Sequence, residues 1–159
     1  MYLSIMHPGL LPHVIELARG LGGVATDQPI LVIKTFKEVI LTDILEGKPE
    51  GIALDMNQSR SIEGFETELI GVTTTAEGGG YEKTAGSDVV VITAGIPRKP
   101  GMSRMDLLEV NAGIVGGVAK NIAKYAPNSV ILVVSNPLDE MTALAQKASN
   151  FDKSRVIGQ

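Results

Sequence analysis

Three short apolar runs constrain the fold of this chain most strongly. They lie at residues 39–41, 89–92 and 130–134. Each run is rich in β-branched residues and apolar at successive positions, so both faces of a strand would be buried. Such strands are typical of a parallel sheet covered by helices on both sides. Residues 67–72 alternate in polarity and predict a further or edge strand.

A helix is predicted between the second and third runs, over residues 103–125. Ser103 and Asp106 have the spacing of a capping box, which satisfies free N–H groups in a first helical turn. Apolar residues then recur every three or four positions and form one stripe, namely Leu107, Val110, Ile114, Val118, Ile122 and Tyr125. Pro127 ends this helix.

A second helix is expected over residues 137–148, with Pro137 in its first turn, where the missing N–H costs nothing. Residues 156–158 then begin another strand. Strands that alternate with helices favour right-handed crossovers between parallel strands. The sequence therefore predicts an α/β fold with a doubly wound, Rossmann-type parallel sheet.

A glycine pattern near the start predicts a phosphate-binding turn. Gly20, Gly22 and Ala25, with Gly23 between them, fit G-x-G-x-x-G/A, which combines a tight turn, bare backbone and a helix N-terminus facing a pyrophosphate. Asp43 follows about 20 residues later at the end of a predicted strand. A carboxylate there can accept hydrogen bonds from both ribose hydroxyls and would repel a 2′-phosphate. These residues predict NAD as the cofactor.

The alternative for the same segment is the end of a helix. Glu16 and Arg19 are unfavourable in a strand buried on both faces, and Gly20 would then be a C-terminal helix stop. Pro29 would fall in the second turn of the helix expected after the glycines. We therefore divide the chain into an atypical segment, residues 1–37, with a candidate glycine loop, and residues 38–159, the remainder of a dinucleotide-binding domain.

An arginine-containing loop and an asparagine follow the second and third runs. Arg98 and Arg104 lie in residues 93–104, beyond the carboxyl end of a strand, where open α/β sheets bind ligands. Two guanidinium groups could each grip one carboxylate of a small molecule, and the alternative is a solvated cationic loop. Asn136 could present its amide to a substrate oxygen, or cap the helix that begins at Pro137.

Composition excludes several other classes. With 14 basic and 18 acidic residues, the chain lacks the basic excess of a nucleic-acid binder. It has no cysteine, so disulfides, thiol nucleophiles and cysteine-ligated zinc are excluded, and no metal site is predicted. No apolar run approaches the ~20 residues of a membrane span, and the first residues lack the basic character of a signal peptide. The cytoplasm is the predicted location.

Several segments together resemble the NAD-dependent malate dehydrogenases of the lactate dehydrogenase-like type. The resemblance is continuous over about residues 38–158, and before residue 38 it is limited to the glycine pattern and its spacing. The segments that carry it are residues 39–44, 51–56, 87–95, 96–104, 106–108, 111–115, 135–139 and 155–158. It implies the cofactor-binding half of such an enzyme, lacking the C-terminal substrate domain.

The resemblance also implies roles for the matched residues. Arg98 would pair with the distal carboxylate of malate or oxaloacetate, Arg104 would polarise the reacting carbonyl, and Asn136 would orient the same oxygen. Residues 95–101 would close as a lid that excludes water. The cofactor-binding set would be Gly20, Gly22, Gly23, Ala25, Asp43, Thr93, Ala94, Gly95, Asn111, Val134 and Asn136. Within it, Asp43 would hold the adenine ribose, and Asn111, Val134 and Asn136 would lie along the nicotinamide half of NAD.

The residues that transfer the proton in this family lie beyond the end of the chain. The only histidines are His7 and His13, so no acid–base histidine and no other catalytic residue is expected here. We expect malate oxidation by the isolated chain to be absent or severely impaired. The alternative is a non-catalytic NAD-binding or interaction module, and a complete enzyme of another Rossmann class is disfavoured because no Tyr-x-x-x-Lys pair occurs. A small dicarboxylate and a second copy of the chain are the expected partners, with no nucleic acid or membrane.

Overall fold

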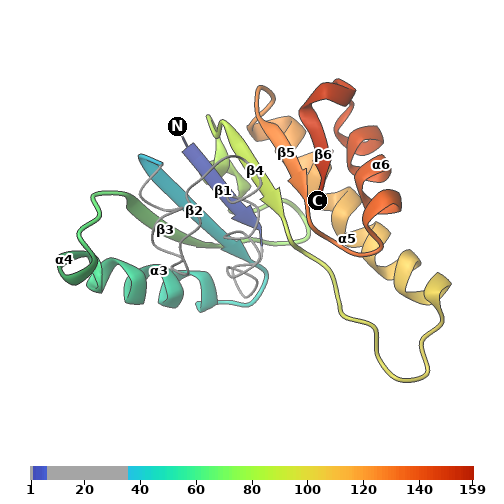
Figure 1. Cartoon of the computed structure of the whole chain (residues 1–159), viewed down its shortest axis with the longest axis horizontal. Helices are drawn as coiled ribbons and strands as arrows, with labels where there is room; N and C mark the ends of the chain where they lie inside the picture. Colours follow the sequence, from blue (N-terminus) through green and yellow to red (C-terminus); the bar gives the residue numbers. More distant parts are fainter. Residues whose placement is uncertain (1, 7–35) are drawn as a thin grey trace.

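The structure, a computed structural model, describes residues 2–6 by their backbone and residues 36–159 in full (Figure 1). It contains a six-stranded parallel sheet in the order β3-β2-β1-β4-β5-β6. The strands are β1 (Tyr2–Met6), β2 (Glu38–Asp43), β3 (Glu68–Thr73), β4 (Val89–Ile92), β5 (Val130–Val133) and β6 (Val156–Gly158). This is the strand order of the doubly wound Rossmann-type fold, so the predicted fold class is confirmed.

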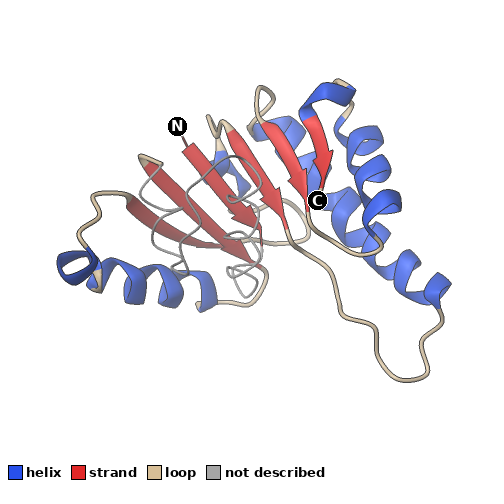
Figure 2. Ribbon diagram, viewed as in Figure 1, coloured by secondary structure: helices blue, strands red, loops and turns tan. Residues whose placement is uncertain are grey.

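Helices cover both faces of the sheet (Figure 2). They are α3 (Lys48–Gln58), α4 (Arg60–Glu63), α5 (Arg104–Tyr125) and α6 (Leu138–Ser149), with short 3-10 turns η2 (Tyr81–Thr84) and η3 (Lys153–Arg155). In β4, Val90 and Ile92 pack with the core under α5 and α6, whereas Val91 packs with Ala53 of α3 and with Phe65. Alternate residues of one strand therefore bury apolar surface on opposite faces, as the apolar runs predicted.

The three apolar runs and the principal helix are confirmed. Ser103 is the N-cap of α5, and its capping box with Asp106 is present. Residues 67–72 fall largely within β3, which is an edge strand. The second helix is shifted slightly: Pro137 precedes the first helical residue as the N-cap of α6, and the peptide bond before it is cis.

The strand β1 and the helices α3 and α4 were not predicted. β1 pairs with β2 on one side and β4 on the other, with Leu3 opposite both Val39 and Val89. The five residues of β1 have Ser4 in their middle, so no continuous apolar run marks this strand, and α3 has Gly51, a poor helix former, in its first turn. The boundary at residue 37 stays a prediction, although β1 places part of the N-terminal segment in the same sheet.

A close approach between α3 and β3 brings the sheet edge near the site described below. A Cβ added at Gly71 would overlap the backbone of Pro49, so the strand passes directly under the helix start. Glu50 reinforces this contact, because its Oε1 accepts from the Thr73 N–H (2.6 Å) and its Oε2 accepts from the Thr73 hydroxyl (3.0 Å). Within residues 2–6 and 36–159, no helix is long and apolar enough to cross a membrane.

Candidate functional site

A cavity of about 480 Å³ opens at the carboxyl ends of β2, β3 and β4. Open α/β sheets bind ligands at this edge. The cavity is lined by the end of β2 and the segments that follow β2, β3 and β4, by Tyr81, and by one face of α5. The lining residues are Thr42, Asp43, Ile44, Leu45, Thr74, Thr75, Ala76, Tyr81, Ala94, Gly95, Ile96, Gly113, Ile114, Gly117, Val118 and Asn121. Asp43, Ala94 and Gly95 of the predicted cofactor set therefore meet at one cavity.

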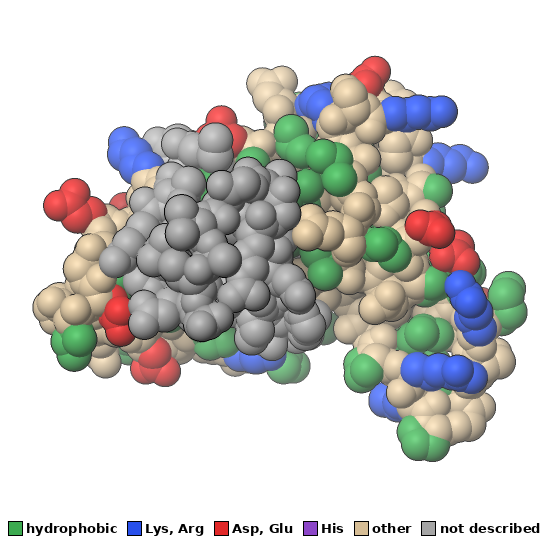
Figure 3. Space-filling view, in the orientation of Figure 1, with side chains coloured by type: hydrophobic (Ala, Val, Ile, Leu, Met, Phe, Trp, Pro, Cys, Tyr) green, Lys and Arg blue, Asp and Glu red, His purple; other side chains and the backbone are tan. Residues whose placement is uncertain are grey.

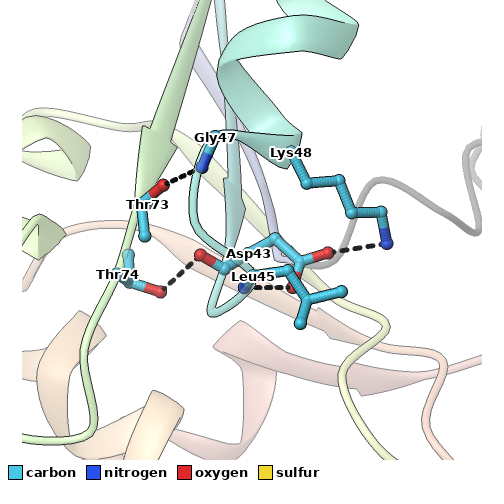
Figure 4. Close-up of polar contacts among 6 residues, drawn as sticks. All are labelled: Asp43, Leu45, Gly47, Lys48, Thr73 and Thr74. Carbon is cyan, nitrogen blue, oxygen red and sulfur yellow. Dashed lines mark hydrogen bonds and ion pairs between the residues drawn. The ribbon is translucent and has the colours of Figure 1, made fainter.

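Asp43 is the last residue of β2 and carries the buried carboxylate of this cavity, with its side chain 4% exposed (Figure 4). Its Oδ1 accepts a hydrogen bond from the Leu45 N–H at 3.1 Å, and its Oδ2 lies 3.0 Å from Nζ of Lys48. The carboxylate is therefore held by its own turn and by a cation at the start of α3, an ion pair that the sequence did not reveal.

The end of β3 supports this turn. The Thr74 N–H donates to the backbone oxygen of Asp43 at 2.9 Å, and the Gly47 N–H donates to the Thr73 hydroxyl at 3.1 Å. Desolvation raises the pKa of Glu50, but hydrogen bonds from its own N–H and from the N–H and hydroxyl of Thr73 outweigh it and hold that pKa below its usual value. Glu50 is thus ionised at neutral pH and keeps α3 in place beside Asp43.

Two glycines leave part of the α5 wall of the cavity without side chains. Nothing lies within 4 Å of a Cβ added at Gly113 or Gly117, so both positions open into space. Glycine inside a helix costs about 1 kcal/mol of stability relative to alanine. Repeated glycines in α5 were therefore a usable signal that part of this face of the helix is kept free of side chains. Sequence reasoning missed it, together with the apolar walls formed by Ile44, Ile96 and Ile114.

Tyr81 forms a polar spot in an otherwise apolar part of the cavity. The residue is 5% exposed. Burial raises the pKa of its phenol, and a side-chain hydrogen bond with Thr74 only partly opposes the shift. The hydroxyl is therefore neutral at physiological pH and can donate a hydrogen bond.

Asn111 is buried, at 1% exposed, and bonds to two backbone segments. Its Oδ1 accepts from the Ile96 N–H at 2.8 Å, and its Nδ2 donates to the Asn136 oxygen at 2.7 Å and to the Ile96 oxygen at 3.3 Å. Gly95, with φ +146°, passes so close that an added Cβ would lie 3.2 Å from the Asn111 amide. The side chain thus holds the base of the arginine loop against the turn after β5.

The structure does not bring Arg98 and Arg104 to the cavity. The loop that carries Arg98 and leads to Arg104 projects from the sheet in Figure 1, and Lys and Arg side chains gather on the projecting part at the lower right of Figure 3. Arg98 Nε donates to the Met102 oxygen at 3.0 Å. Arg104 is 76% exposed at the start of α5, with Glu140 of α6 at 3.6 Å. The side chains of Arg98, on the loop, and Arg104, at the helix start, are both exposed.

The remaining predicted residues follow β4 and β5. Thr93 is buried, Val134 donates its N–H to the Ile92 oxygen at 2.9 Å, and the side chain of Asn136 is exposed. The alternative role of Asn136 as a helix cap is wrong, because the N-cap of α6 is Pro137 and no side chain caps it. The predicted glycine loop, with Gly20, Gly22, Gly23 and Ala25, lies outside the described residues.

Comparison with known proteins matches residues 18–158 to the family described as lactate/malate dehydrogenase, NAD binding domain. The chain is 58% identical over 121 residues to malate dehydrogenase from Flavobacterium johnsoniae, covering 76% of this chain and 37% of that protein. Malate dehydrogenase from Picrophilus torridus in its apo form has a TM-score of 0.78 at 36% identity, covering 97% of this chain and 44% of that one.

Malate dehydrogenase from Archaeoglobus fulgidus in complex with NADH is similar to the same extent. It has a TM-score of 0.77 at 32% identity, covering 98% of this chain and 47% of that one. The chain therefore spans less than half the length of each of these three relatives.

Proposed function

The chain belongs to the lactate/malate dehydrogenase NAD-binding domain family, and on that premise we propose that it binds NAD at the carboxyl edge of its sheet as the cofactor half of a malate dehydrogenase. The observation that carries the proposal is the buried carboxylate of Asp43 at the end of β2, facing a cavity of about 480 Å³. A carboxylate in this position accepts hydrogen bonds from the ribose of NAD. The volume lies within the range of small-molecule sites.

The walls of the cavity fit the adenosine end of the cofactor. Ile44, Ile96 and Ile114 offer apolar surface to a flat ring, and the open face at Gly113 and Gly117 leaves room for it. Asp43 would hold the ribose, and Ala94 and Gly95 would pass beside the cofactor backbone. Gly20, Gly22, Gly23 and Ala25 stay a prediction for the pyrophosphate.

The nicotinamide end is proposed to lie toward Thr93, Val134 and Asn136, at the ends of β4 and β5. The exposed amide of Asn136 would orient the reacting oxygen of the substrate. For Asn111 the contacts support an indirect role. Its side-chain amide is hydrogen-bonded to the backbone of Ile96 and Asn136, so it would position these segments at the nicotinamide end rather than contact the cofactor.

We propose malate and oxaloacetate as the substrate pair, with Arg98 binding the distal carboxylate and Arg104 polarising the carbonyl. Arg98 lies on the loop that projects from the sheet and Arg104 is the first residue of α5, and neither lines the cavity, so this segment has to move toward the cavity before they act. NAD, when bound, supplies the hydride acceptor. Within residues 36–159 there is no histidine to move the proton, so we propose that turnover by this chain alone is absent or severely impaired.

Titration of NADH fluorescence with the purified chain tests the cofactor site. We expect saturable binding that Asp43→Ala weakens, because the ribose loses its acceptor, while Asp55→Ala on the exposed face of α3 leaves it unchanged. Absence of binding would contradict the proposal. Oxaloacetate-dependent NADH oxidation tests the second part, and turnover near that of a full-length relative would contradict the need for further residues.

A non-catalytic module that binds NAD and acts through a partner is the second candidate. Exposed apolar side chains favour association, among them Leu54 of α3 and Ile62 of α4, which are 58% and 85% exposed. Sedimentation of the chain with and without NADH tests self-association. Location in the cytoplasm stays a prediction of the same kind.

A further inference from the structure

The carboxylate at the ribose end of the cavity does not act as a lone negative charge. Lys48 places Nζ 3.0 Å from Asp43 Oδ2, as Figure 4 shows. The Asp43 side chain is 4% exposed and that of Lys48 is 34% exposed, so the pair is partly buried with the ammonium at its solvent side. A partly buried pair is screened less by salt than one on the open surface.

The fold fixes Lys48 in this position. Only the turn of residues 44–47 separates it from Asp43, because Lys48 is the first residue of α3. The turn is tied at both ends, since the Leu45 N–H donates to Asp43 and the Gly47 N–H donates to Thr73. Gly47, the N-cap of α3, has φ +73°, a left-handed conformation that lets the chain turn into the helix at Lys48.

The charge of Lys48 bears on which dinucleotide the site accepts. A carboxylate alone repels the 2′-phosphate of NADP, whereas a nearby cation accommodates it. Lysine is a compact point charge with three donors, and it binds phosphates in that capacity. Two other carboxylates oppose it: Glu46 lies on the same turn, and Glu50 directs both oxygens to Thr73. In the described residues, the carboxylate that forms an ion pair with Lys48 is that of Asp43 rather than Glu46 or Glu50.

We propose that Lys48 weakens the discrimination of this site against a 2′-phosphate, so that it takes NADP(H) as well as NAD(H), with a modest preference for NAD(H). The inference rests on the proposed function, because it requires a dinucleotide whose adenine ribose lies at Asp43. It makes Lys48 a specificity-determining residue of the cofactor site.

The test compares NADH and NADPH binding to the full chain by fluorescence titration. In the wild type the two dissociation constants are expected to differ by about tenfold or less. Lys48→Met is expected to raise the ratio of the NADPH dissociation constant to the NADH dissociation constant by on the order of tenfold, mainly through weaker NADPH binding. Lys48→Arg keeps the charge and should keep the ratio. Lys147→Met removes one exposed positive charge from α6, outside the cavity lining, and should also keep it.

The outcomes separate the two proposals. No binding of either dinucleotide would overturn both the proposed function and this inference. Saturable NADH binding with NADPH excluded by more than about a hundredfold, or with an unchanged ratio in Lys48→Met, would overturn the inference alone. If Lys48→Met does not fold, calorimetry on the wild-type chain decides the matter: adenosine 2′,5′-bisphosphate should bind within about tenfold of adenosine 5′-monophosphate, and failure to do so overturns the inference.

Discussion

The side-chain amide of Asn111 donates a hydrogen bond to the backbone oxygen of Asn136 at 2.7 Å, and so joins the middle of α5 to the turn between β5 and α6. The same amide accepts from and donates to Ile96, at the base of the arginine loop. One buried side chain therefore fixes the relative positions of two segments that are proposed to meet the nicotinamide and the substrate.

Asn111→Leu should destabilise the fold by about 1–3 kcal/mol, because polar backbone groups of Ile96 and Asn136 would be left unsatisfied in a buried position. Urea unfolding measures the loss. Asn121→Ala is a matched control, since its amide donates only to the Gly117 oxygen on an exposed part of α5. Equal stability of the two variants would contradict the bridging role.

Gly71→Ala should destabilise the chain by about 1–3 kcal/mol, because a Cβ there overlaps the backbone of Pro49 and forces α3 away from β3. Gly51→Ala, in the same helix, has open space around the new Cβ and should stabilise it by about 0.5–1 kcal/mol. Thermal unfolding of both variants gives the comparison. Similar shifts of the two midpoints would show that α3 does not pack this closely.

Ser103→Ala should cost about 1 kcal/mol, because it removes the oxygen that accepts from the Asp106 N–H at 3.1 Å. The loss falls on the first turn of α5, which carries Arg104. Hydrogen exchange of the amides in this turn should accelerate, while those near Ile122 remain protected. Uniform acceleration along α5 would instead indicate a global effect.

Stability should fall as the pH drops below about 4.5, because three carboxylates, those of Glu50, Asp106 and Asp152, have lowered pKa values in the folded chain. Hydrogen bonds from the backbone and side chain of Ser103 lower the pKa of Asp106, and those described above lower that of Glu50. A carboxylate whose pKa is lower in the folded chain stabilises the fold at pH values above its unfolded-state pKa. This stabilisation is lost as the pH falls through the folded-state pKa. The free energy of unfolding between pH 3 and 6 should slope less in Glu50→Gln, and an unchanged slope would contradict the Glu50 contribution.

Gly117→Leu should weaken NADH binding by about tenfold or more while leaving the fold intact, because the new side chain enters the cavity and leucine favours a helix. Circular dichroism verifies folding, and NADH titration measures affinity. Lys120→Leu, an exposed change in the same helix, should leave affinity unchanged. Undiminished affinity in Gly117→Leu would place the cofactor elsewhere.

The sheet was largely predictable because its buried strands are nearly continuous in β-branched residues, as in Val89–Ile92. The start of α5 was predictable from Ser103 and Asp106, since a capping box depends on local spacing alone. β1 was not, because its place in the sheet depends on pairing with strands distant in sequence. α3 was missed since packing against Gly71 outweighs the weak helix propensity of its first turn.

The site was predictable where one residue follows one strand, as Asp43 follows β2. Contacts across elements were not, because the ion pair of Lys48 and the bonds of Asn111 exist only after helices and strands are packed. Spacing alone left Arg98 and Arg104 as either a ligand-binding pair or a solvated cationic loop. The structure places Arg98 on the projecting loop and Arg104 at the start of α5, and neither lines the cavity.

The central place of β1 has a consequence for how the chain assembles. β2 and β4 do not pair with each other in the described sheet, and each pairs with Tyr2–Met6 instead. These five residues are synthesised before the other strands of the described sheet, and one of their neighbours, Val89–Ile92, follows more than eighty residues later. The seam between the two halves of the sheet therefore closes late, through contacts of high sequence separation that slow folding. Until then, the inner edges of β2 and β4 stay open to strands of other molecules.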